Sequence, residues 1–210
     1  SEQPIGIFYN SPKQTYETYN QIFSTKSTRL SKAPYLPQGK VAIYNTTFEE
    51  AGYNPLPEWK EPPESLSGTP GLADEYPLIL SDYHTSKSYT ASWGRNNPLL
   101  REQHSDPVIH IHPETAAGHK IKDGDWVIVE SPHAWMKVKA QLYPGIRPDT
   151  LMILHGWWQG CQELGYADYP LLNGGANVNT MYSVDINKAF DPLITAMSSQ
   201  TLVRIKKYVE

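Results

Sequence analysis

The chain has 210 residues, of which 39% are hydrophobic and 19% charged, a composition that supports a folded core. Its formal net charge of -4 argues against a nucleic-acid-binding surface, which needs a basic excess, and no apolar run reaches the roughly 18 residues that a membrane helix requires. The only cysteine, Cys161, excludes an internal disulfide framework and an all-cysteine metal or iron–sulfur site within the chain, and no signal peptide is recognisable at Ser1.

Residues 1–75 are predicted to form an extended, proline-rich arm or linker from a preceding domain, because prolines interrupt every potential long helix. A short strand is expected only over residues 39–45. Residues 55–63 are typical of a polyproline-like linker. A free segment this long is unusual in a compact domain, so we expect it to wrap over the rest of the fold or over a neighbour.

Residues 76–210 carry the signals of a β domain. Residues 136–142 alternate apolar and polar side chains, which predicts a strand with one solvated face. Residues 203–206 alternate again and are expected to close the sheet. Short strands are predicted over residues 76–81, 108–112, 126–131, 136–142, 151–154 and 203–206. So many short strands with few helices favour a β-barrel.

Two short helices are expected between these strands. Residues 92–102 are predicted to form a helix or turn in which Trp93, Leu99 and Leu100 face inward. Pro113 is predicted to open the other helix, because proline suits the first helical position, and Gly118 to end it.

One candidate for catalysis is the pair His110 and His112, which lie two apart on a predicted strand and so share a face. With Glu114 they would make a metal site of the kind found in cupin-like barrel enzymes. The spacing departs from the cupin pattern, because Glu114 follows His112 by only two positions and His104 stands where a cupin has glycine. The simpler interpretation is that both histidines are polar residues on a half-exposed strand.

Two polar loops are candidates for ligand binding. Residues 84–90 offer five side-chain hydroxyls and one lysine, groups that can donate to a phosphate. Residues 173–180 contain Gly174 and Gly175, which would allow close approach of backbone to a ligand. Asn177 and Asn179 can each donate and accept, which suits the edge of a purine or pterin. An ordinary solvated loop and an ordinary turn are the alternatives.

The order of several short motifs resembles the C-terminal, dinucleotide-binding domain of the dimethyl-sulfoxide-reductase superfamily of molybdenum and tungsten oxidoreductases. The motifs are His-Pro-Glu-Thr-Ala at 112–116, Lys-Asp-Gly-Asp at 122–125, Gly-Ile-Arg-Pro at 145–148, His-Gly-Trp-Trp at 155–158, Asn-Val-Asn at 177–179 and Asp-Pro at 191–192. Their order and spacing together are specific, although each alone is common. The resemblance covers roughly residues 39–207.

The resemblance implies a mainly β fold: a double-psi β-barrel of the aspartate-decarboxylase-like class over residues 76–210, with short helices and the extended arm 1–75. It implies a molybdopterin guanine dinucleotide cofactor. Hydroxyl and histidine side chains of residues 84–90 would approach its diphosphate and pterin, and the remaining positions would contact its other polar edges. The implied cofactor-binding residues are His84, Thr85, Ser88, Thr90, His155, Gly156, Asn177, Asn179, Ser198 and Ser199.

The family's metal ligand and its iron–sulfur cysteine cluster lie in earlier domains that this chain does not contain. The resemblance therefore implies a portion of a larger catalytic subunit, without catalytic residues of its own, or else a naturally separate subunit. Its partners would be the remaining domains of the parent subunit and an iron–sulfur electron-transfer subunit. The parent enzyme would carry out two-electron redox, oxygen-atom or sulfur transfer, in the cytoplasm or periplasm of a bacterium or archaeon.

Overall fold

The computed structural model describes residues 2–3, 7–10, 15–18, 43–56, 58–83, 93–185, 190–191, 196–197 and 200–209. Its contacts divide the chain into two units, Ser1–Lys60 and Glu61–Glu210. Residues 61–75 thus belong to the second unit by their contacts, and the separation into an arm (1–75) and a barrel domain (76–210) stays a prediction.

The first unit contains a small antiparallel sheet in the order β1-β2-β3 and the helix α2, with the bounds β1 Glu2–Gln3, β2 Ile7–Asn10, β3 Thr15–Thr18 and α2 Thr46–Glu50. Asn45 starts α2, because its side chain accepts from the Phe48 backbone N–H at 3.3 Å. Of the strand expected over residues 39–45, only 43–45 are described, and they form a bend. The sheet was not predicted, because such short strands show no measurable period of two.

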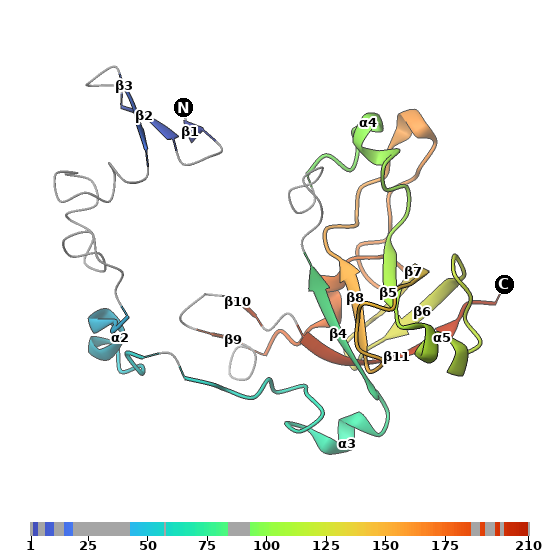
Figure 1. Ribbon diagram of the computed structural model, residues 1–210, viewed down its shortest axis with the longest axis horizontal. Coiled ribbons are helices and arrows are strands. Elements are labelled where there is room, and N and C mark those ends of the chain that lie inside the picture. Colours follow the sequence, from blue (N-terminus) through green and yellow to red (C-terminus); the bar gives the residue numbers. More distant parts are fainter. Residues whose placement is uncertain are drawn as a thin grey trace. The chain divides into compact units, whose positions relative to one another are not determined.

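The second unit is built on a closed barrel with the strand order β11-β4-β8-β5-β7-β6 (Figure 1). The strands are β4 Leu78–Tyr83, β5 Val108–Ile111, β6 Trp126–Glu130, β7 Trp135–Leu142, β8 Thr150–Leu154 and β11 Gln200–Lys207. The pairs β4–β8 and β5–β7 are parallel and the other neighbours antiparallel. The predicted mainly β barrel is confirmed, and β11 closes it as expected.

The barrel core follows from the alternation along its strands. On β7, Met136, Val138 and Ala140 are buried while the intervening lysines are partly exposed, so the predicted single wet face is confirmed. The inward positions of the other strands are also aliphatic: Leu80, Ile109, Ile111, Val127, Val129, Leu151, Ile153 and Val203 are all fully buried. These side chains form one continuous core that fixes the positions of both barrel ends.

Short helices and turns connect the strands, with the bounds α3 Pro70–Ala73, α4 Pro98–Arg101, α5 Pro113–Gly118, η2 Gln162–Leu164 and η3 Val178–Met181. The short strands β9 Phe190–Asp191 and β10 Ala196–Met197 pair with each other. The predicted helix 113–118 is confirmed, with Pro113 in its first turn and the ring of His112 as its cap. No helix within the described ranges is long and apolar enough to span a bilayer.

The orientation predicted for residues 92–102 is wrong for two of its three side chains. Trp93 is 77% exposed and Leu99 75% exposed, whereas Arg95 and Arg101 are completely buried. The reason is that both guanidinium groups bind backbone carbonyl oxygens of the segment 155–159. These hydrogen bonds offset part of the cost of burying each charged group.

Candidate functional site

The barrel topology brings distant parts of the chain to one end. β4 and β8 run parallel and end side by side, since Tyr83 pairs with Leu154. β11 runs antiparallel to β4 and begins there, since Gln200 pairs with Ser81. The end of β4, the end of β8 and the start of β11 therefore lie at the same end of the barrel. Among the predicted contact residues, His84, Thr85, Ser88, Thr90, Ser198 and Ser199 lie outside the described residues.

The four predicted residues that are described come together at this end. Trp157 and Ala176 form an antiparallel bridge, so that Gly156 and Asn177 are neighbours on facing segments. The Asn177 side chain accepts from the Asn179 backbone N–H at 3.2 Å and caps η3.

His155 is partly buried, while Asn179 is exposed and its side chain has no hydrogen bond within the described residues. The site thus contains a partly buried histidine ring and, on Asn179, an exposed side-chain amide.

A carboxylate that the sequence did not suggest lies behind His155. Asp82, on β4, has one oxygen 3.0 Å from His155 Nδ1, and its other oxygen accepts from the Tyr182 hydroxyl at 3.0 Å. Burial, followed by the negative charge of Asp82 and the hydrogen bond to it, raises the pKa of Tyr182, which therefore remains a donor. Asp82 could have been noticed as the acid that interrupts an apolar strand, but Tyr182 carries no local signal.

Two buried arginines support the turn that follows β8. Arg95 donates to the backbone oxygens of His155 and Gly156 at 2.8 and 3.0 Å. Its guanidinium lies 3.9 Å from the centre of the Trp157 ring, and that of Arg101 lies 4.8 Å from the same centre. Gly156 has a φ of +83°, a conformation that favours glycine. The buried guanidinium groups of Arg95 and Arg101 therefore hold the His155–Gly156 turn in place from its interior side.

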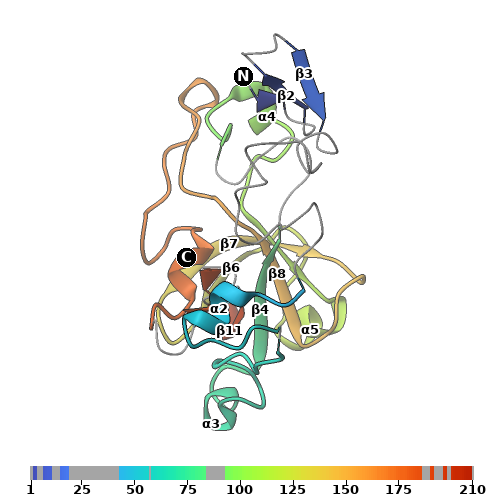
Figure 2. The same ribbon diagram turned by 90° about the vertical axis from the view of Figure 1, so that its left-hand side faces the viewer.

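These arginines also organise the loops beyond the barrel end. Arg101 donates to the backbone oxygen of Gln159 at 2.9 Å and to the Tyr169 hydroxyl at 3.0 Å. In Figures 1 and 2, α4 and the segment containing η2 project from the same end of the barrel. Arg101 thus ties the α4 loop to the segment that continues from the His155–Gly156 turn.

The two glycines of the 173–180 loop are explained by contacts within the chain. A Cβ on Gly175 would lie 1.8 Å from the Pro170 carbonyl oxygen. Gly174 has a φ of +87°, and a Cβ there would lie 2.9 Å from the ring of Trp135. The glycines close a tight turn against β7, so the expectation that they admit a ligand gives way to the turn interpretation.

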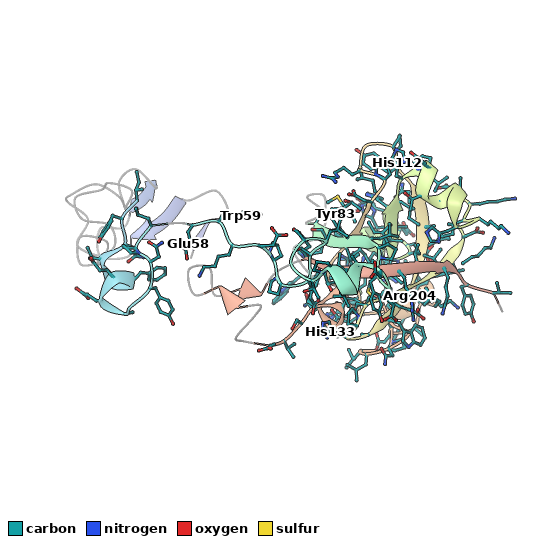
Figure 3. The ribbon with its side chains drawn as sticks, turned by 90° about the horizontal axis from the view of Figure 1, so that it is seen from below. Glu58, Trp59, Tyr83, His112, His133 and Arg204 are labelled. Atoms are coloured by element: carbon teal, nitrogen blue, oxygen red, sulfur yellow. The ribbon has the colours of Figure 1, made fainter. Side chains whose placement is uncertain are left out.

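His110 on β5 and His112, which follows this strand, both make structural contacts. His110 stacks on Tyr83 with ring centres 5.2 Å apart and has Nε2 3.1 Å from Gln141. Its pKa is lowered, mainly by burial. The ring of His112 caps α5, and Figure 3 shows His112 and His133 on opposite sides of the barrel.

Within the described ranges, no group of three or more His, Cys, Asp or Glu could hold a metal. The alternative enzyme using His110, His112 and Glu114 therefore has no support.

Comparison with known proteins gives consistent matches. The family model described as "Molydopterin dinucleotide binding domain" matches residues 78–194, more than half of the chain. The chain is 37% identical over 142 residues to acetylene hydratase of Syntrophotalea acetylenica, which covers 65% of this chain and 19% of that protein. It is 31% identical over 182 residues to trimethylamine-N-oxide reductase of Haemophilus influenzae, covering 82% of this chain and 21% of that protein.

A solved structure of acetylene hydratase from Pelobacter acetylenicus resembles the fold with a TM-score of 0.65 and 31% identity, over 81% of this chain and 24% of that one. The chain spans about a fifth of the length of these curated relatives.

Proposed function

The chain belongs to the molybdopterin dinucleotide-binding domain family, and on this premise we propose that its barrel holds molybdopterin guanine dinucleotide in the catalytic subunit of a molybdenum- or tungsten-dependent oxidoreductase. The observation that carries the proposal is the meeting of His155, Gly156, Asn177 and Asn179 at the barrel end where the chain also leaves β4 and enters β11. Segments far apart in the sequence thus bring polar groups together at one end of the barrel.

The chemistry of these groups fits a dinucleotide. The open amide of Asn179 can pair with the donor and acceptor edge of a pterin or guanine ring. The buried Arg95 and Arg101, behind the His155–Gly156 turn, place positive charge where an anionic diphosphate would be stabilised. We propose that His84, Thr85, Ser88, Thr90, Ser198 and Ser199 complete the contact.

When bound, the cofactor would supply the two-electron redox or atom-transfer chemistry through its metal. The residues of this chain would bind the cofactor, orient it and exclude water from one side of it. The metal ligand, an iron–sulfur cluster and the electron-transfer partner would come from the remaining domains of the parent protein and from a further subunit.

The test uses the full-length protein that carries this chain. We expect the purified protein to contain molybdenum or tungsten, and mild acid hydrolysis to release GMP from the bound dinucleotide. His155→Ala and Asn179→Ala should each lower the cofactor content, because one lost hydrogen bond weakens binding about two- to tenfold. The control His119→Ala changes an exposed side chain at the end of α5 and should retain full content.

Two results would contradict the proposal. One is a full-length protein that contains no molybdopterin. The other is a cofactor whose hydrolysis releases a nucleotide other than GMP, which would leave the binding role but reject the guanine dinucleotide.

A further inference from the structure

A three-residue hydrogen-bonded chain crosses the barrel end. Asp82 lies on β4, His155 follows β8, and Tyr182 follows η3. Each of the two bonds to the Asp82 carboxylate measures 3.0 Å. The side chains of His155 and Asp82 are only 15% and 14% exposed. Burying a carboxylate to this depth costs desolvation free energy. Asp82 nevertheless holds two partners that are distant in sequence, which points to a role in the site.

We propose that Asp82 is the positioning residue of the site: it fixes the ring plane and the tautomer of His155 and ties that ring to the segment 177–182. The inference rests on the proposed function only in its claim that His155 meets the cofactor.

The physical basis lies in the donors and acceptors. An ionised carboxylate can only accept, so the proton between Asp82 and His155 belongs to Nδ1. Nε2 of the neutral ring is then an acceptor, and Nε2 of the protonated ring is a donor, while the ring plane is the same in both states. A histidine without such a partner would be free to exchange tautomers and to rotate about its side-chain bonds.

Tyr182 prevents the carboxylate from turning away. Its side chain is 7% exposed and belongs to the barrel core, so the hydroxyl is held in place. The hydroxyl donates to one oxygen of Asp82, and the His155 ring lies at the other, so the two contacts fix the plane of the carboxylate. Because Tyr182 ends the segment that begins with Asn177, one carboxylate sets both contact segments relative to each other.

The first measurement reads the tautomer directly, in the 210-residue chain labelled with nitrogen-15 histidine. Long-range proton–nitrogen correlation spectra distinguish Nδ1–H from Nε2–H rings, and the His155→Gln variant identifies the signal. At a pH that keeps the ring neutral, we expect the wild-type ring to carry its proton on Nδ1. In Asp82→Asn the population should move toward Nε2–H, because an amide has one acceptor oxygen for two donors. A wild-type ring with Nε2–H would overturn the proposal without any variant.

The second measurement reads cofactor retention in the full-length protein. Asp82→Asn should release the molybdopterin dinucleotide about tenfold faster than wild type, the effect of losing one charge-assisted hydrogen bond. Tyr182→Phe should accelerate release less, because the bond from His155 remains.

Asp125→Asn is the matched control. Its carboxylate also accepts two hydrogen bonds, but at the start of β6, at the other end of the barrel, and its release rate should equal that of wild type. Unchanged tautomer and unchanged release in Asp82→Asn would reject the positioning role. If the wild-type protein holds no such cofactor, the proposed function fails, and the tautomer spectra alone decide whether Asp82 positions His155.

Discussion

Replacing Arg101 by lysine tests whether buried guanidinium groups hold the loops at the barrel end. The Arg101 side chain is completely buried. Its nitrogens serve four oxygens: those of the Ser105, Arg95 and Gln159 backbone and of the Tyr169 hydroxyl, at 3.0, 3.3, 2.9 and 3.0 Å. The donors of a guanidinium point in fixed directions from three nitrogens, so a single group can reach acceptors on several sides.

A lysine ammonium keeps the charge but donates from one atom, and we expect it to reach at most two of these oxygens. A buried acceptor that loses its donor costs about 1–3 kcal/mol. With two acceptors lost, Arg101→Lys should lower the free energy of unfolding by about 2–6 kcal/mol. This is a large part of the 5–15 kcal/mol that typically stabilises a folded protein.

Urea unfolding of the 210-residue chain, followed by tryptophan fluorescence and circular dichroism, measures this loss. Arg147→Lys is the control, since the Arg147 side chain is 76% exposed and its ion pair with Asp149 is a surface contact. That control should change the free energy by less than about 1 kcal/mol. If Arg101→Lys lowers the free energy of unfolding no more than the control does, the role assigned to the buried Arg101 guanidinium is refuted.

Three further predictions concern the barrel. A hydrogen bond from Lys206 is the main cause that lowers the pKa of Glu130, so its stabilising contribution is present above pH 4.5 and is lost as the pH falls below that value. Unfolding free energies in a pH series should therefore decline less on the acid side for Glu130→Gln, and an equal decline would argue against the ion pair. Gly175→Ala should cost about 1–3 kcal/mol in urea unfolding, because its Cβ would overlap a backbone carbonyl oxygen, whereas Gly118→Ala has open space. Burial lowers the pKa of His110, so its NMR titration midpoint should lie below 6.5, and a midpoint above that value would mean the ring is better solvated than its contacts indicate.

The barrel itself could be predicted from the sequence because its signals are local. Alternation with period two marks β7, and Pro113 marks the start of α5, whatever the rest of the chain does. The resemblance predicted the cofactor and its contact positions. The His155–Gly156 turn and the Asn177–Asn179 segment are separate in the sequence, and the bridge between Trp157 and Ala176 brings them together.

Local patterns failed where a side chain's environment depends on distant partners. Hydrophobicity placed Trp93 and Leu99 inside, but Arg95 and Arg101 are the buried residues of that loop. Burial of these guanidinium groups is tolerated only because carbonyl oxygens from residues about sixty positions away accept their hydrogen bonds.

The same reason separates what the sequence determined from what the tertiary structure decided about the site. The sequence determined the strands, the family resemblance and the candidate polar residues of the site. The link from Asp82 to His155, 73 residues away, and to Tyr182, 100 residues away, exists only once the barrel has closed. Hydrogen bonds depend on distance and direction in space, and spacing along the chain encodes neither across a closed sheet.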